Sequence, residues 1–186
     1  MQDGSWKTLG QNYIYENPWC AFRVDEVQLP DGAVIEYGVL ESGGFAAVVP
    51  VTGDGGVILV RQWRQPLGKF TLELPSGAVD AGEDARQSAE RELLEETGYR
   101  AEELEPLISF HTSTGRSTEM CHLFRCRAVW GLGGPRPEPT EFIEVVEKPL
   151  DEVVARISRG EITDAATVLG IQMVVVRFGP DANKVH

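Results

Sequence analysis

Short runs of apolar residues separated by turn-forming residues dominate the first half of the chain. Separators rich in glycine and proline or serine lie at residues 30–32, 42–44 and 52–56, where a strand would reverse direction. The strands predicted from the runs cover residues 22–27, 33–40, 45–51, 57–61 and 70–74. The first half of the chain is therefore typical of a β-sheet protein.

The pattern changes to a helical period between about residues 83 and 97. The apolar residues that recur there at spacings of four or five are Ala85, Ala89, Leu93 and Leu94. We expect Leu93 and Leu94 to anchor this helix in the core, and Gly98 to end it as a left-handed cap. Further strands are predicted at 107–111, 120–129 and 141–147, helices at 150–159 and 164–178, and a surface loop at 131–140. The result is a mixed sheet with helices packed on it, in one domain over residues 1–186.

Composition and charge narrow the class of protein. The chain has 186 residues, 42% hydrophobic and 25% charged, as in ordinary globular domains. Its 17 Lys and Arg against 29 Asp and Glu give a net charge of −12, which disfavours nucleic-acid binding. Residues 1–10 lack the features of a signal peptide, and no apolar run approaches the ~20 residues that span a bilayer. We expect a cytoplasmic protein without a membrane segment.

Cysteine and histidine give no sign of a metal or disulfide framework. The three cysteines, Cys20, Cys121 and Cys126, form an odd set without zinc-like spacing, and we expect them to be reduced core residues. The three histidines are scattered along the sequence. Candidate chemistry therefore depends on the carboxylates.

Three carboxylates share one edge of the predicted helix. Glu92 and Glu96 are one turn apart, and Glu95 lies beside them at the three-residue spacing. Such like-charged neighbours destabilise an isolated helix by about 0.2–0.5 kcal/mol per pair. A hard cation such as Mg²⁺ relieves the repulsion, since it takes oxygen ligands and leaves positions for water and phosphate. Arg91 can pair with one glutamate and orient it. An ordinary solvated helix face is the alternative interpretation.

The spacing around these glutamates resembles the Nudix hydrolase signature. That signature has a glycine, a glutamate six positions later, and then Arg-Glu, an apolar residue, any residue, Glu-Glu, any residue, glycine and an apolar residue. The matching residues are Gly77, Glu83, Arg91, Glu92, Leu93, Glu95, Glu96 and Gly98. Tyr99 is a softer fit to the last position. A match of this length has a low risk of arising by chance.

Other segments are similar to the branch of the family that contains ADP-ribose pyrophosphatases and nucleoside diphosphate sugar hydrolases. They lie at residues 15–19, 30–32, 60–64, 73–75 and 164–167. The resemblance implies an α/β/α sandwich with a mixed β-sheet and Mg²⁺ or Mn²⁺ as cofactor. It implies cleavage of the pyrophosphate bond of a nucleoside diphosphate sugar, ADP-ribose or a hexose derivative, to a nucleoside monophosphate and a sugar phosphate. It also implies a homodimer to which the N-terminal strands, about residues 1–42, contribute.

The resemblance assigns roles to particular residues. Glu92 and Glu96 are expected to bind metal, with Glu95 shared between ions and the backbone carbonyl of Ser76 as a further ligand. Glu119, in the loop 112–119, is the candidate general base, and Glu95 is the alternative. Related enzymes carry a Ser-Pro-Gly-x-Ser-x-Glu pattern in this loop, whereas this chain has Thr114 in place of the proline.

Cationic and aromatic residues are candidates for substrate binding. Arg61, Arg64 and Arg116 can hold a phosphate, and Trp19 and Tyr15 can stack on a nucleobase. Structural ion pairing is the alternative role for the arginines, and core packing is the alternative for the aromatic residues.

Two other functions compete with sugar-nucleotide hydrolysis. The first is a Nudix module that binds a nucleotide without catalysis, against which the intact glutamate set argues. The second is a Nudix hydrolase that acts on nucleoside triphosphates or capped RNA. The net charge disfavours long RNA, and the flanking segments favour the sugar branch.

Overall fold

A computed structural model of the chain describes residues 4–80, 82–131, 134–136 and 142–179. The backbone divides into two compact units. The N-terminal unit comprises residues up to 44 together with 111–120, and the main unit comprises 45–110 together with the residues from 121 on. Each unit is described separately below. No helix in the described ranges has both the length and the apolar character needed to cross a membrane.

The N-terminal unit is an antiparallel sheet of three strands in the order β1-β2-β3. The strands are β1 (Lys7–Glu16), β2 (Cys20–Gln28) and β3 (Val34–Ser42). The segment 111–120 belongs to the same unit and is tied to β3. The Leu40 amide donates to the carbonyl of Arg116 at 2.8 Å, and the Thr118 amide donates to the carbonyl of Leu40 at 3.1 Å.

A network of charges replaces an apolar core in this sheet. Most residues of β1 and β3 are exposed or half-buried. On β2 the Arg23 guanidinium donates to both carboxylate oxygens of Asp25, at 2.7 and 3.2 Å, and also pairs with Glu41. Glu41 accepts a further hydrogen bond from the Tyr13 hydroxyl at 2.8 Å. The sheet is thus held by strand pairing and ion pairs.

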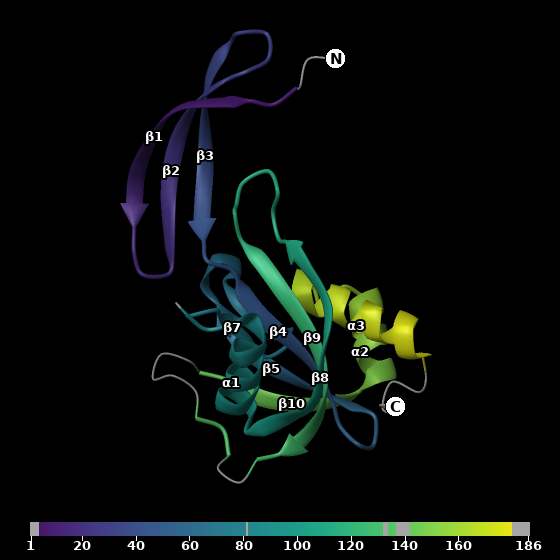
Figure 1. Ribbon diagram of the computed structural model, residues 1–186. Coiled ribbons are helices and arrows are strands. Elements are labelled where there is room, and N and C mark those ends of the chain that lie inside the picture. The colour runs from purple at the N-terminus through teal and green to yellow at the C-terminus, as the bar shows by residue number, and fades with distance from the viewer. Residues whose placement is uncertain (1–3, 81, 132–133, 137–141, 180–186) are drawn as a thin grey trace. The chain divides into compact units, whose positions relative to one another are not determined.

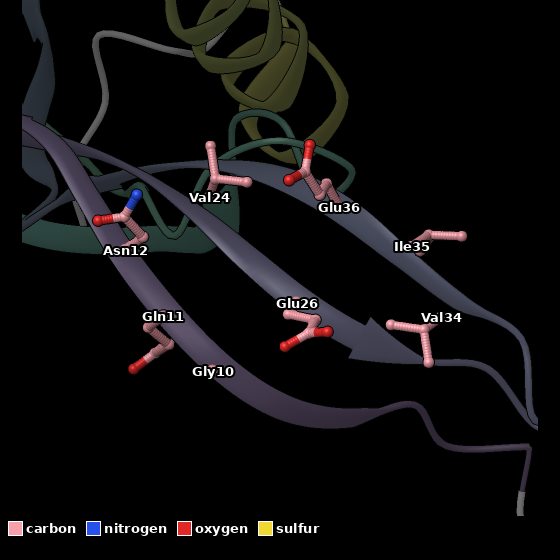
Figure 2. A pocket seen from close by; sticks show the side chains of 8 residues that line it. All are labelled: Gly10, Gln11, Asn12, Val24, Glu26, Val34, Ile35 and Glu36. Atoms are coloured by element: carbon pink, nitrogen blue, oxygen red, sulfur yellow. The ribbon is translucent and has the colours of Figure 1, made fainter.

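Figure 2 shows a hollow of about 530 Å³ on the same sheet. Its lining mixes carboxylate, amide and aliphatic side chains from all three strands. The lining residues are Gly10, Gln11, Asn12, Val24, Glu26, Val34, Ile35 and Glu36. They include none of the residues that the sequence predicts for the functional site.

The main unit contains a mixed seven-stranded sheet. Its main path is β10-β5-β4-β9-β8, with β6 paired to β5 and β7 paired to β4. β4 runs parallel to β9, from Phe45 opposite Cys121 to Val51 opposite Arg127, and antiparallel to β5 and β7. The strands are β4 (Phe45–Val51), β5 (Gly56–Arg64), β6 (Lys69–Glu73), β7 (Ser76–Ala78), β8 (Tyr99–His111), β9 (Met120–Trp130) and β10 (Glu144–Pro149); a short 3₁₀ helix, η1 (Gln65–Leu67), joins β5 to β6.

Helices cover both faces of this sheet (Figure 1). Alternate residues of β4 point to opposite sides, as the period of a strand requires. Ala46 and Val48 pack with α1 (Ala85–Thr97), whereas Ala47 and Val49 lie in the core beneath α2 (Leu150–Ser158) and α3 (Ala165–Phe178). The unit is therefore an α/β/α sandwich, and the predicted fold class is confirmed.

The ends of α1 follow from its sequence. Asp84 caps the amide of Gln87 at 2.9 Å, and the Gln87 side chain accepts from the Asp84 amide at 3.1 Å, which completes a capping box. Gly98 ends the helix with φ of 77°. A Cβ atom on Gly98 would lie 2.8 Å from the carbonyl carbon of Gly134, so both the backbone angle and the space favour glycine.

Several predicted elements need correction. The sequence did not predict β1, which buries almost nothing and so shows no apolar period. Residues 76–78, for which no strand was predicted, form the short strand β7, and β8 begins at Tyr99 instead of residue 107. Leu94 is 38% exposed, so Leu93 alone of that pair anchors the helix. The loop predicted at 131–140 falls partly outside the described residues, as does residue 141; the last strand is Glu144–Pro149.

Candidate active site

Two buried glutamates of α1 face the short strand β7. Glu92 is 8% exposed and Glu96 is 2% exposed. The carboxylate of Glu96 accepts a hydrogen bond from the Ser76 amide at 3.0 Å. A Cβ atom on Gly77 would lie 2.1 Å from the carboxylate carbon of Glu92. Glycine is therefore needed at position 77 because the carboxylate occupies the space of a side chain.

Arg91 connects the start of the site to its centre. Its Nε and Nη2 donate to the two oxygens of Glu83 at 3.0 and 2.9 Å, and Nη2 also donates to the Ala78 carbonyl at 3.1 Å. Its Nη1 contacts Glu92 at 2.5 Å and Glu95 at 3.4 Å. The hydrogen bonds from Arg91 lower the pKa of Glu83, and those to Glu83 raise the pKa of Arg91 further. Arg91 thus orients Glu92 while staying fully charged.

Negative charge exceeds positive charge around these residues. Arg64 on β5 forks onto Glu73 through Nε, at 3.1 Å to each carboxylate oxygen, and through Nη2. Its pKa is raised mainly by that hydrogen bonding, with smaller contributions from the charges of Asp164 and Glu96. The site therefore combines two arginines with a larger number of carboxylates, and buried carboxylates are costly without compensating charge.

The donor set suits a hard divalent cation. In the part of the chain that the structure describes, no three histidine, cysteine, aspartate or glutamate side chains converge into a complete metal cage. Mg²⁺ does not need such a cage, because it retains several waters and binds through one or two carboxylates plus phosphate oxygens. Glu92 and Glu96 of α1, together with the backbone carbonyl of Ser76 in β7, fit this requirement.

The candidate arginines of β5 have structural partners. Both lie within the strand, which extends to Arg64 and not to residue 61 as predicted. Arg61 pairs with Glu144 at 3.0 Å, and its guanidinium carbon lies 4.0 Å from the ring centroid of Phe70. Arg64 pairs with Glu73 but stays partly exposed. Structural ion pairing, the alternative role considered for both residues, is therefore present, and a substrate role stays a prediction.

The remaining substrate candidates belong to the N-terminal unit. Trp19, in the turn between β1 and β2, is 76% exposed, and Tyr15, near the end of β1, is 60% exposed, so neither packs in a core. Trp19 lines a hollow of about 280 Å³ together with Asn17, Ser42 and others of the unit. The Arg116 residue is exposed. Their exposure is compatible with binding, but no role follows from it.

Glu119 is held more firmly than a solvated loop residue. One carboxylate oxygen accepts from the Thr112 hydroxyl at 2.7 Å and the other from the Ser42 hydroxyl at 3.4 Å. The Glu119 amide donates to the Ser117 hydroxyl at 3.1 Å. The loop is thus preorganised around this carboxylate, whereas its role as a base stays a prediction.

Three residues that matter for the geometry received no role from the sequence. Glu83 anchors Arg91, Gly77 makes room for Glu92, and Thr167 on α3 accepts a hydrogen bond from the amide of Leu74 at 2.9 Å. The signature spacing contains the first two. Thr167 is separated from Leu74 by 93 positions, and no local pattern predicts that contact.

Two family models match the chain. The model of the NUDIX domain matches residues 44–166, and the model of the nucleoside diphosphate sugar hydrolase N-terminal domain matches residues 6–40. The chain belongs to the Nudix hydrolase family. The family membership predicted from the glutamate signature is therefore confirmed, and the match to the NUDIX domain contains all the strands of the main unit together with α1 and α2.

Named relatives cover almost the whole of this Nudix hydrolase. The methanol dehydrogenase activator of Bacillus methanolicus is 35% identical over 167 residues, which cover 89% of this chain and 90% of the relative. The ADP-ribose pyrophosphatase of Bacillus subtilis (strain 168) is 33% identical over 179 residues, which cover 96% of this chain and 97% of the relative.

A solved structure has the same fold. The crystal structure of an ADP compounds hydrolase superimposes with a TM-score of 0.76 and covers 91% of each chain. Only 20% of the residues are identical, so this likeness supports the fold and carries no argument about substrate.

Proposed function

We propose that this Nudix hydrolase cleaves the pyrophosphate bond of a nucleoside diphosphate sugar, either ADP-ribose or a nucleoside diphosphate hexose. The products are a nucleoside monophosphate and a sugar phosphate. The observation that carries the proposal is the pair of buried glutamates, Glu92 and Glu96, which face Gly77 and Ser76 of the strand β7. The N-terminal domain match and the Bacillus subtilis relative named ADP-ribose pyrophosphatase support the substrate class.

The proposed cofactor is Mg²⁺ or Mn²⁺. Glu92, Glu96 and the Ser76 carbonyl would hold it, and Glu95 would share a second ion. When bound, the cation neutralises charge on the two phosphates and stabilises the leaving phosphate. Arg91 contributes by keeping the Glu92 carboxylate in one orientation, and the Ser76 amide does the same for Glu96.

Water is the proposed nucleophile and needs a base. Glu119 is the first candidate, because two hydroxyl groups hold its carboxylate in one place. Glu95 is the second candidate. Its carboxylate lies 3.4 Å from Arg91 and its side chain is partly exposed, so water can reach it. The pH dependence of kcat in Glu119→Gln and Glu95→Gln separates them, because the variant that lacks the base loses the acidic limb of the profile.

Substrate contacts and assembly complete the proposal. Arg64, Arg61 and Arg116 are proposed to contact phosphate or sugar, and Trp19 and Tyr15 to stack on the nucleobase.

We further propose a single functional unit over residues 1–186 that forms a homodimer through residues 1–42, acts in the cytoplasm and binds no nucleic acid. Sedimentation equilibrium tests the dimer: the full chain should have the mass of two chains, and the chain without residues 1–42 should have the mass of one.

A substrate panel tests the reaction. Purified protein with Mg²⁺ or Mn²⁺ is incubated with ADP-ribose, GDP-mannose, UDP-glucose and a nucleoside triphosphate, and products are separated by chromatography. Turnover of a diphosphate sugar to monophosphate and sugar phosphate is expected. Tight binding without turnover would favour the non-catalytic module, and preference for the triphosphate would move the enzyme to another branch.

Two substitutions test the site within that reaction. Glu92→Gln and Glu96→Gln are each expected to lower kcat/KM by on the order of 10²–10³-fold, as losing one electrostatic stabiliser does. Glu90→Gln, an exposed position on the same helix, is the matched control and should retain wild-type activity. Full activity in both glutamine variants would rule out the proposed metal site.

A further inference from the structure

Thr167 is a buried hydroxyl at the first turn of α3. It is fully inaccessible to solvent. Its oxygen accepts a hydrogen bond from the Leu74 amide at 2.9 Å and donates one to the Asp164 carboxylate at 2.7 Å. Asp164 also caps the helix by accepting from the Thr167 amide at 2.8 Å. The hydroxyl thus donates one hydrogen bond and accepts one, and the two bonds fix its orientation.

The backbone that Thr167 holds leads directly into the carboxylate site. Leu74 is followed by Pro75, whose carbonyl accepts from the Val48 amide at 3.1 Å. The next amide, that of Ser76, donates to Glu96 at 3.0 Å. A shift of the chain at Leu74 would therefore be passed within two residues to the group that orients Glu96.

Every residue from 73 to 76 has such a restraint. Glu73 is buried, and its carboxylate accepts hydrogen bonds from the Arg64 guanidinium and from the Thr71 hydroxyl, the latter at 2.5 Å. Of the four restraints, the one at Leu74 is the only one supplied by α3. Because Leu74 is buried, removal of the hydroxyl leaves its amide without this acceptor, and an unsatisfied buried amide is costly. The chain would then relax toward another partner.

We propose that Thr167, supported by Asp164, is a positioning residue of the metal site. It fixes the segment 74–76, so that the Ser76 amide and carbonyl stay in place for Glu96 and for the cation. It touches neither substrate nor cation. The inference rests on the proposed function, since it concerns the affinity of the same site for a divalent ion.

The experiment measures Mn²⁺ binding directly. Free Mn²⁺ is quantified by electron paramagnetic resonance during titration of the full chain, without substrate. Thr167→Val, which keeps the side-chain shape, is expected to weaken Mn²⁺ binding about tenfold, in the range seen when outer-shell partners of metal ligands are removed. Thr167→Ser keeps the hydroxyl and is expected to restore binding. Kinetic titration with Mn²⁺ should show the same change in the activation constant.

A matched control separates positioning from loss of stability. Ile171→Val removes one methylene from a fully buried position of the same helix and leaves the Leu74 contact intact. It should lower the urea midpoint without weakening Mn²⁺ binding. If Thr167→Val does not fold, Asp164→Ala removes the partner of the hydroxyl at a partly exposed position and should weaken binding in the same direction, by less.

The outcomes are distinguishable from failure of the proposed function. A wild-type chain that binds no Mn²⁺ overturns the metal site itself. A wild-type chain that binds Mn²⁺, together with Thr167→Val or Asp164→Ala variants that bind it equally well, overturns the positioning role alone. Weakening in Ile171→Val by the same factor as in Thr167→Val would also overturn it, because the effect would then follow stability.

Discussion

The central strands of the two sheets are built in different ways. In β4 of the main unit, all residues from Ala46 to Val51 are buried, and the strand contributes side chains to two apolar cores on opposite faces of the sheet. In β2 of the N-terminal unit, the buried positions include Asp25, and Arg23 beside it is half-buried. One sheet is held by apolar packing and the other by strand pairing and ion pairs, and the buried glutamates Glu92 and Glu96 belong to the packed unit.

Exposed apolar side chains make the contrast sharper. The N-terminal unit presents a large number of them for a sheet of three strands. They are Trp6, Leu9, Tyr13, Ile14, Tyr15, Trp19, Phe22, Val34 and Leu40. So many exposed apolar side chains on one small unit leave apolar surface that a second molecule can cover. This agrees with the proposed homodimer, in which a second copy would supply the missing core.

The largest expected effect tests this contrast with one substitution made in both units. Leu59→Ala, at a fully buried position of β5, should lower the free energy of unfolding of the main unit by about 2–5 kcal/mol. Leu40→Ala, at a 41% exposed position of β3, should cost the N-terminal unit less than about 1 kcal/mol in the monomer. Urea unfolding followed by tryptophan fluorescence measures both.

Protein concentration sharpens that result. If the homodimer covers Leu40, then Leu40→Ala weakens the dimer as well as the fold. The loss in free energy of unfolding caused by Leu40→Ala should therefore grow with protein concentration, because association stabilises the folded chain by mass action. If Leu40→Ala lowered the free energy of unfolding of the dilute monomer as much as Leu59→Ala does, this would contradict the view that the N-terminal sheet lacks a core of its own.

The same contrast explains which elements the sequence predicts. β4 was predicted at its observed bounds, because an uninterrupted apolar run between turn residues has one interpretation in a sheet covered on both faces. The helix of the signature was predicted within two residues of its start and ended correctly at Thr97. β1 was missed because burial creates the alternation that reveals a strand, and β1 is exposed nearly throughout.

For the site, local spacing predicted the local contacts. Glu92 and Glu96 are four positions apart, as are Arg91 and Glu95, so one turn of helix places each pair on the same face. The role of Ser76 was predicted from resemblance alone. Thr167 was not predicted, because its contact depends on how α3 packs over the end of β6, which no short-range pattern encodes. The contacts among residues close in sequence were therefore predictable from the signature, whereas the contact between Thr167 and Leu74 required the structure.

An intermediate effect on activity comes from the glycine of the site. Gly77→Ala should lower kcat/KM by about 100-fold, because the new Cβ would lie 2.1 Å from the Glu92 carboxylate carbon and would displace it. Gly53→Ala is the matched control, since nothing lies within 4 Å of its Cβ position. Both proteins should remain folded by circular dichroism. An active Gly77→Ala enzyme would show that Glu92 does not need this position.

The smallest effect concerns the charges of the N-terminal sheet. Hydrogen bonding from Arg23 lowers the pKa of Asp25, and hydrogen bonds from Tyr13 and Arg23 lower the pKa of Glu41. Since both folded pKa values lie below the ordinary value of about 4, the stability that these groups contribute is complete above that pH. It is lost as the pH falls through the lowered values, when protons bind and the ion pairs break.

Asp25→Asn should therefore reduce the acid sensitivity of the N-terminal unit, because one of its two carboxyl groups with a lowered pKa is removed. Urea midpoints between pH 7 and 2.5 are measured in a variant that keeps Trp6 and Trp19 as reporters, with Trp63 and Trp130 replaced by phenylalanine. The complementary variant, which reports on the main unit, is the control. Its pH profile should be unchanged by Asp25→Asn, because its own acid dependence comes from groups such as Glu83 beside Arg91. If the urea midpoint of the N-terminal unit fell with pH as steeply in Asp25→Asn as in the wild type, strand pairing without this ion pair would be sufficient to stabilise the sheet.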